Sequence, residues 1–198
     1  MQTRLLFLLV IVAGSIYTAS AQETKREQPA KKGCSCSFSS LNQAGVLNGS
    51  KGASLTIQSI NGIKYKTWFA GVGVGVDGYY RASLPVFLDV RKDLLKKKET
   101  PFLYADVGYH FVLDTKDRLS QWYENIYNKG SMYTDVGVGY RFGFTQKGSW
   151  IVSAGYSYKY VMYDNKYLYE CPTSRCYENY FTVKSYLHRY SMRLGYQF

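Results

Sequence analysis

The sequence has few cysteines and histidines, few acidic residues and only one long apolar run. Its 198 residues include four cysteines and two histidines, and 14 acidic residues stand against 25 basic ones. After residue 21, no segment reaches the roughly 18 uninterrupted apolar residues of a transmembrane helix. No histidine lies near Cys34-Ser-Cys36, and two thiolates alone do not argue for a metal site. We therefore expect no bound metal and no cofactor.

The one apolar run lies at the N-terminus. Met1 to Arg4 carries a single basic side chain, Leu5 to Ala13 is apolar, and Ala19-Ser20-Ala21 has the small-x-small pattern of a cleavage site. Residues 1–21 are therefore predicted to be a secretory signal peptide, and residues 22–37 a polar periplasmic tail. No cysteine follows the cleavage site directly, so a lipid-modified N-terminus is not expected.

The four cysteines of an exported chain fit oxidised pairs better than thiol chemistry. Cys171 and Cys176 are predicted to form a disulfide in an outward loop, while the state of Cys34 and Cys36 stays open. The low acidic content leaves a net charge of +11, much of it in the polar tail and near residues 91–98. Export, and the absence of a basic helix or a nucleic-acid motif, argue against nucleic-acid binding.

Aromatic residues are abundant, and long segments alternate between apolar and other residues. Aromatic residues make up 17% of the chain, with 21 tyrosines. Gly73 to Gly78 has the G-x-G-x-x-G spacing of a nucleotide loop, but Pro85 and period-two alternation follow where that motif needs a helix. Apolar and other residues alternate, as in strands, through segments around 72–76, 83–91, 103–111, 132–144, 150–159 and 189–198, and 53–60 supplies a seventh strand.

The pattern favours a membrane barrel over a soluble sandwich. Glycines on the non-apolar face make room inside a narrow barrel, and aromatic residues gather near strand ends. Parity requires an eighth strand, which only Phe38 to Leu47 can supply. The predicted fold is all-β, an eight-stranded antiparallel up-and-down transmembrane β-barrel over residues 38–198. Longer loops at alternate connections place both termini in the periplasm.

Turn dipeptides mark the expected hairpins. Asn48-Gly49, Asn61-Gly62 and Asp77-Gly78 are predicted to be hairpin turns, and Gln146-Lys147-Gly148 another short turn. The outward loops are expected at Asp114 to Gly130 and Tyr163 to Tyr180. Within the first of these, Leu119, Trp122, Tyr123 and Ile126 recur at helical spacing and predict a short amphipathic helix. Such a helix would be a lid or lipid-surface float, or a contact surface for a partner.

Several segments together resemble the small eight-stranded outer-membrane barrels of Gram-negative bacteria, the OmpA/OmpX type. They are Ile60-Asn-Gly62, Phe69 to Gly75, Leu84 to Arg91, Pro101 to Tyr109 and Arg193 to Phe198. The resemblance implies a location in the cell outer membrane, with outer-membrane lipid and lipopolysaccharide as neighbours. It also implies that Tyr196 and Phe198 belong to the signal read by the barrel-assembly machinery. The family implies no single activity.

An eight-stranded barrel is filled by its own side chains, so a plugged lumen is expected. The strand parity points eight charged residues inward as a structural network: Asp89, Arg91, Asp106, Asp135, Arg141, Lys159, Arg189 and Arg193. The leading functional hypothesis is a non-enzymatic barrel that anchors outward loops, with an extracellular partner bound through 114–130 and 163–180. The alternatives are a conduit for small hydrophobic molecules and a lipid A-modifying enzyme.

The sequence offers no clear catalytic site. His188 and Ser191 are three residues apart on one strand and therefore point to opposite faces. His110 is predicted to point inward, where the sequence does not show its neighbours. We therefore predict no catalytic residues.

Overall fold

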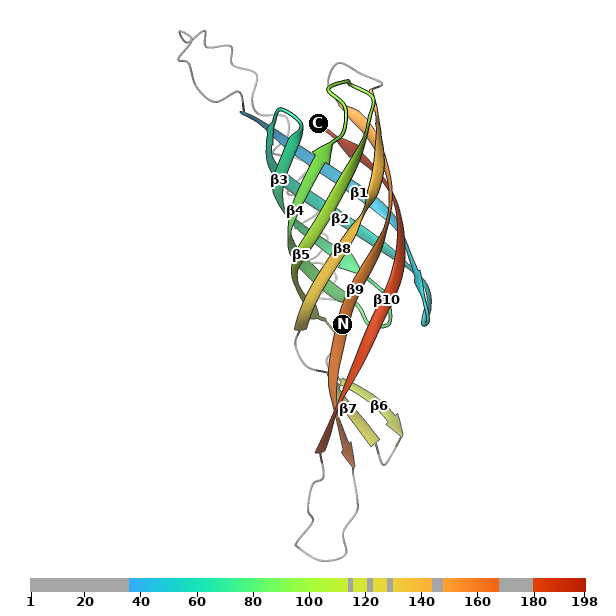
Figure 1. Ribbon diagram of the computed structural model, residues 1–198. Coiled ribbons are helices and arrows are strands. Elements are labelled where there is room, and N and C mark those ends of the chain that lie inside the picture. The colour runs from blue at the N-terminus through green and yellow to red at the C-terminus, as the bar shows by residue number, and fades with distance from the viewer. Residues whose placement is uncertain (1–35, 114–115, 121–122, 128–129, 144–147, 168–179) are drawn as a thin grey trace, which may run out of the picture. The chain divides into compact units, whose positions relative to one another are not determined.

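The computed structural model describes residues 36–113, 116–120, 123–127, 130–143, 148–167 and 180–198, and these form an all-β barrel (Figure 1). Among these residues, no helix is long and apolar enough to cross a membrane. The described strands are β1 Cys36–Gly49, β2 Gly52–Tyr65, β3 Trp68–Asp77, β4 Ser83–Asp93, β5 Thr100–Val112, β6 Lys116–Ser120, β7 Tyr123–Tyr127, β8 Gly130–Phe142, β9 Ser149–Tyr167 and β10 Tyr180–Gln197.

Eight of these strands close the barrel, in the order β10-β1-β2-β3-β4-β5-β8-β9, with β9 paired to β10. Every pair is antiparallel. The closing ladder runs from Leu41 opposite Gln197 to Gly49 opposite Arg189. Beyond it, Ser40 and Phe198 exchange two backbone hydrogen bonds of 2.8 and 2.9 Å. The predicted fold class, the strand count and the first strand near 38–47 are therefore confirmed.

Side chains alternate between the wall and the lumen with the expected period of two. Along β4, Val86 and Leu88 are exposed, whereas Phe87 and Asp89 are 2% and 0% exposed. The outer wall consequently carries nearly all of the exposed large apolar side chains, such as Val138, which is 57% exposed. In a soluble protein the apolar face of a sheet is expected to point into the core, whereas here it points outward.

Glycines on the inner face make room for aromatic rings. Gly73 lies opposite Phe87 across β3 and β4, and a Cβ on Gly73 would overlap the Phe87 ring. Gly139 stands in the same relation to Phe102 across β8 and β5. The inner face of the Gly-Val repeat is thus occupied by rings from neighbouring strands, and the repeat is part of the barrel wall.

Three of the predicted turns differ from the structure. Asn61 and Gly62 lie inside β2, where they pair with Val72 and Gly71 of β3. The chain turns instead at Lys66 and Thr67, and Lys66 adopts a positive φ of 55°. Gly62 is needed in the strand because a Cβ there would overlap the backbone of β3. At Asn48-Gly49 the turn residues are the next two, Ser50 and Lys51.

Asp77-Gly78 is also not a two-residue hairpin. Asp77 ends β3, and its carboxylate accepts the backbone N–H of Tyr79 at 2.7 Å, which starts a connection that reaches residue 82. This side-chain bond to the backbone two residues ahead is an Asx-type turn. For the turn predicted at Gln146-Lys147-Gly148, residues 146 and 147 lie outside the described residues.

The predicted amphipathic helix is also wrong. The described residues between 114 and 130 form two strands, β6 and β7, which pair with each other, and β7 pairs with β9 from Tyr123 opposite Tyr167 to Tyr127 opposite Tyr163. The expected loop from 163 is likewise strand up to Tyr167. The long β9 offers an unpaired edge beyond the barrel, and ladder hydrogen bonds to that edge outweigh a weak local helical pattern.

The packing of rings against glycines predicts that Gly73→Ala destabilises the barrel. The added methyl group meets the Phe87 ring inside a filled lumen, and overpacking of this kind costs about 1–3 kcal/mol. Gly78→Ala is the matched control, because its Cβ meets the hydroxyl of Ser54, which can rotate away, and the Leu55 backbone oxygen at an ordinary contact distance of 3.8 Å. The measurement is the free energy of unfolding in detergent by urea titration. Equal stability of both variants would contradict this packing, and Phe87→Leu combined with Gly73→Ala should recover part of the loss.

Candidate functional site

The lumen contains a balanced set of buried charges. Among the described residues, five carboxylates and five cations are at most 6% exposed: Asp77, Asp89, Asp93, Asp106, Asp135, Arg91, Arg141, Lys159, Arg189 and Arg193. Burying an ion in a low-dielectric interior costs several kcal/mol unless it is paired and hydrogen-bonded. The pairs are arranged in groups along the lumen.

The first group lies where β3 ends, at the end of the barrel that carries β6 and β7. Lys159 donates to Asp77 at 2.8 Å and to the Ser83 hydroxyl at 3.0 Å. Arg189 also binds Asp77 and donates to Ser157 at 2.5 Å. One carboxylate therefore joins β3 to β9 and β10 across the lumen.

The second group is centred on Asp135 of β8. Arg193 forms an ion pair with Asp135, and the Tyr104 hydroxyl donates to the same carboxylate at 2.8 Å. The Arg193 guanidinium also lies over the Tyr104 ring, 5.8 Å from its centroid. Next to this group, Gln58 donates to the Tyr133 hydroxyl at 3.2 Å. The middle of the lumen is thereby crossed by hydrogen bonds from four strands.

Three carboxylates stand side by side on neighbouring strands. Asp106 of β5 lies directly opposite Asp89 on one side and Asp135 on the other. Asp89 is neutralised by Arg91, whose Nη2 lies 2.8 Å away. Both oxygens of Asp106 lack a hydrogen-bond partner, although the residue is 2% exposed. Asp106 is consequently the least compensated charge in the lumen, since like charges directly opposite each other repel.

Apolar side chains fill the lumen between the charged groups. One cluster contains Leu41, Ile60, Phe69, Phe87, Phe102, Tyr104, Tyr133 and Ile151. A second contains Leu47, Tyr79, Val112, Val161 and Leu187, with Tyr80 and Tyr163 packed against it. Both clusters consist of buried side chains from strands on different sides of the barrel, together with Tyr79 from a loop.

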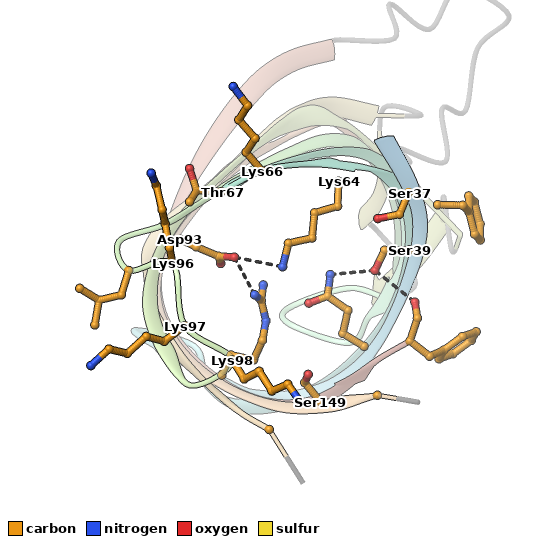
Figure 2. Close-up of a pocket in the computed structure, with 17 residues that line it drawn as sticks. Ser37, Ser39, Lys64, Lys66, Thr67, Asp93, Lys96, Lys97, Lys98 and Ser149 are labelled. Carbon is orange, nitrogen blue, oxygen red and sulfur yellow. Dashed lines mark hydrogen bonds and ion pairs between the residues drawn. The ribbon is translucent and has the colours of Figure 1, made fainter. Parts of the chain in front are cut away.

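The lumen opens at the end where β10 terminates, into a cavity of about 830 Å³ (Figure 2). Asp93 lies in this opening and pairs with Arg141 at 2.6 Å and with Lys64 at 3.1 Å. On the opposite side, Gln197 donates to the Ser39 hydroxyl at 2.9 Å. We call this cavity the basic mouth, because its described lining contains Lys64, Lys66, Lys96, Lys97, Lys98 and Arg141 against a single side-chain carboxylate, that of Asp93.

A serine and a histidine meet in the lumen, a contact that the sequence could not show. His110 and Ser131 are directly opposite across β5 and β8, with 2.6 Å between His110 Nε2 and Ser131 Oγ. Ser131 also donates to the backbone oxygen of Tyr160, and His110 Nδ1 has no partner. Each residue is 1% exposed. Without an orienting group on Nδ1 or access for a substrate, this pair lacks the arrangement of an activated nucleophile.

The eight side chains predicted to form the interior network all lie in the lumen. The structure brings Arg91 to Asp89 and Arg193 to Asp135, but the partners of Arg141, Lys159 and Arg189 are Asp93 and Asp77, which the sequence reasoning missed. Their strand parity could have found them, because Asp77 continues the inward series of Gly73 and Gly75. The predicted eight also held two more cations than carboxylates, which pointed to missing acids.

The remaining predicted residues lie outside this network. Cys171 and Cys176 lie outside the described residues, so their disulfide stays a prediction. Tyr196 and Phe198 lie at the end of β10, their rings 6.3 Å apart, and their role in assembly stays a prediction.

His188 is exposed on the outer wall and Ser191 is buried, so they do not meet. Among the described residues, no group of three or more His, Cys, Asp or Glu is placed to bind a metal ion.

The fold is that of the small eight-stranded outer-membrane barrels. Neisserial surface protein A (NspA) superposes with a TM-score of 0.51 at 13% identity, covering 82% of this chain and 97% of that one. The N-terminal barrel domain of Pseudomonas aeruginosa OprF gives 0.48 at 11% identity, covering 81% and 97%. Outer membrane protein AlkL gives 0.38 at 13% identity, covering 89% and 95%. No family model and no curated protein matches the sequence. The likeness to NspA establishes the fold only.

The arrangement of the three carboxylates predicts opposite outcomes for two similar substitutions. Asp135→Asn leaves the buried Arg193 without its counter-ion and should cost about 3–5 kcal/mol. Asp106→Asn removes a carboxylate that has no hydrogen-bond partner and should change stability by less than about 1 kcal/mol, or increase it. Urea titration of both variants in detergent gives the comparison. A loss at Asp106 as large as that at Asp135 would contradict the assignment.

Proposed function

We propose that this chain is an integral outer-membrane protein without enzymatic activity, whose closed barrel anchors a sheet that extends beyond the wall. The observation that carries the proposal is the inverted distribution of side chains: exposed apolar residues outside, and paired charges within a packed lumen. An exposed apolar surface of this extent marks a contact with lipid or protein. A closed barrel is also the β-structure that satisfies its own backbone within lipid.

Aromatic residues at both ends of the outer wall support the membrane location. At the end near the C-terminus of β10 lie Trp68, Tyr140, Trp150, Tyr196 and Phe198, and toward the other end lie Tyr109, Phe111, Tyr186 and Tyr190. Valine and leucine side chains such as Val107 and Val136 occupy the wall between them. Two aromatic girdles around an apolar band are typical of outer-membrane barrels. Outer-membrane lipid and lipopolysaccharide are accordingly the proposed surroundings, and the barrel-assembly machinery the proposed partner during biogenesis.

The alternative role, a conduit for small hydrophobic molecules, needs an apolar lumen. Here the middle of the lumen holds Asp89, Arg91, Asp135 and Arg193, each at most 3% exposed. An apolar molecule that entered would have to displace these ion pairs at a cost of several kcal/mol. The lipid A-modifying alternative is disfavoured by the inaccessible His110 and Ser131. The anchoring role therefore accounts best for the interior.

The sheet beyond the barrel is the proposed contact surface. β9 and β10 are the longest strands, with 19 and 18 residues, and their extension carries β7 and β6 at the end opposite the C-terminus of β10 (Figure 1). The connections from β5 to β8 and from β9 to β10 leave the barrel at this same end. Because longer loops of bacterial barrels face outward, this end is proposed to be extracellular and to meet the partner.

A packed lumen predicts that the purified protein forms no steady ion channel. We expect no conductance steps when the refolded barrel is added to a planar lipid bilayer, because ions would have to cross both apolar clusters. A porin-type barrel reconstituted in parallel is the positive control. Reproducible channels at the native sequence would overturn the closed-lumen proposal while leaving the fold intact.

The orientation is tested by two epitope insertions at opposite ends of the barrel. An epitope between Ser50 and Lys51 should bind antibody on intact cells, because that turn lies at the proposed extracellular end. The same epitope between Lys96 and Lys97 should bind only after the outer membrane is permeabilised. Fractionation confirms that both variants reach the outer membrane as folded, heat-modifiable protein. The reverse labelling would invert the topology, and recovery in a soluble fraction would reject the membrane location.

A further inference from the structure

The basic mouth has more cations than its carboxylate can pair. Figure 2 shows Lys64 directed into the opening toward Asp93, and Lys98 beside Ser149 on the other side, whereas Lys66, Lys96 and Lys97 point away from it. Arg141 and Lys64 both pair with Asp93, and Lys98 lines the opening across from them, so these three cations face one side-chain carboxylate. The next deeper cation, Arg91, is already paired with Asp89 and lies over the Phe102 ring.

Buried polar atoms in the mouth also lack partners. The Arg141 side chain is 5% exposed, and it uses Nη1 to bind Asp93 while its Nε has no hydrogen-bond partner. A buried N–H donor without a partner costs about 1–3 kcal/mol. Arg91, Arg189 and Arg193 also have such nitrogens deeper in the lumen, and of these four arginines only Arg141 lines the opening, where a ligand can reach it. The edge of a guanidinium group that carries Nε can donate two parallel hydrogen bonds to one oxyanion.

Hydroxyl groups complete the lining. Ser37, Ser39, Thr67 and Ser149 all border the cavity, and since Ser39 donates its hydroxyl to the backbone oxygen of Phe198 at 3.1 Å, the other three remain as candidate donors. Converging cations and hydroxyl donors suit a phosphate group, which carries up to two negative charges and three acceptor oxygens when it is attached to a larger body. The volume of about 830 Å³ lies within the range of small-molecule sites, so the phosphate can be part of a larger molecule.

We infer that the basic mouth is a binding site for a phosphate group, held by Arg141, Lys64 and Lys98. Two sources supply this chemistry: a soluble phosphate compound on the side of the membrane that the mouth faces, and the headgroup of a phospholipid in the adjoining leaflet. The proposed phosphate site does not depend on the anchoring role proposed above. It requires only that the barrel is folded.

The test uses the folded barrel in octyl glucoside, a detergent without phosphate, with inorganic phosphate and pyrophosphate as probes. The readout is the NMR signal of the Arg141 Nε–H group. We expect a saturable shift with either probe and none with chloride at equal ionic strength. Absence of a saturable shift with either probe would overturn the inference.

Three variants identify the groups responsible. Lys64→Gln should weaken binding about tenfold, the loss of one charge-assisted contact, while it keeps the Arg141–Asp93 pair that supports folding. Asp93→Asn removes the competing carboxylate and should strengthen binding by the folded barrel, although it also removes the counter-ion of Arg141 and lowers the free energy of unfolding, so its folding is verified first by heat modifiability. Lys51→Gln is the matched control at the other end of the barrel and should leave binding unchanged. Equal weakening by Lys51→Gln and Lys64→Gln would mean diffuse attraction to a basic protein and would overturn the site.

An experiment in a lipid bilayer distinguishes the two sources of the phosphate group. The Arg141 signal is recorded in nanodiscs that contain phosphatidylglycerol and then titrated with pyrophosphate. If a headgroup occupies the mouth, the signal is already shifted and pyrophosphate adds little. If a soluble phosphate compound is the ligand, the signal starts at its octyl glucoside position and titrates as before. An unshifted signal that also fails to titrate contradicts the assignment.

Discussion

The hydrogen-bonded ladder between β1 and β10 is the constraint on which the rest of the structure depends. It turns an open sheet with two edges into a tube, and the exchange between Ser40 and Phe198 completes the closure. Within lipid an open edge would leave backbone groups unpaired at several kcal/mol each. Closure with eight strands also fixes the diameter, which leaves an interior just wide enough for side chains. The volume and the charge of the lumen are therefore set by the wall.

A lumen of fixed volume accounts for both unusual features of the inner face. Rings such as Phe87 and Phe102 fit because glycines stand opposite them on the neighbouring strands. Four of the five buried cations reach a carboxylate on another strand, as Arg189 reaches Asp77 112 residues away in the sequence, whereas Arg91 pairs with Asp89 on its own strand. The four pairs between strands form only when the barrel assembles, since their partners belong to strands that do not pair with one another. The packing of rings against glycines and the pairing of buried charges thus both favour a single register between the strands.

The sequence predicted what depends on the direction of side chains and missed what depends on register. Period two placed Val74 outside and Asp89 inside, because successive side chains of any strand point to opposite faces. The ion pairs were beyond reach, because the partner of Lys159 depends on the shear of the whole barrel. Asn61-Gly62 looked like a turn because a dipeptide carries local preference only, whereas the ladders to β1 and β3 extend β2 through it. β6 and β7 form because hydrogen bonding to the edge of β9 outweighs the helical spacing of the apolar residues in this segment.

The two ends of the barrel are less constrained than its middle. Inside the lumen an unpaired cation has no access to water, so Arg193 and Arg189 require their carboxylates. At the basic mouth Lys64 retains 29% of its side-chain exposure, and water can solvate its charge without a partner. The fold therefore needs the pair of Arg141 with Asp93 to cap the lumen, but it does not need the further cations there. These further cations, which stability does not require, are the ones assigned above to the proposed phosphate site.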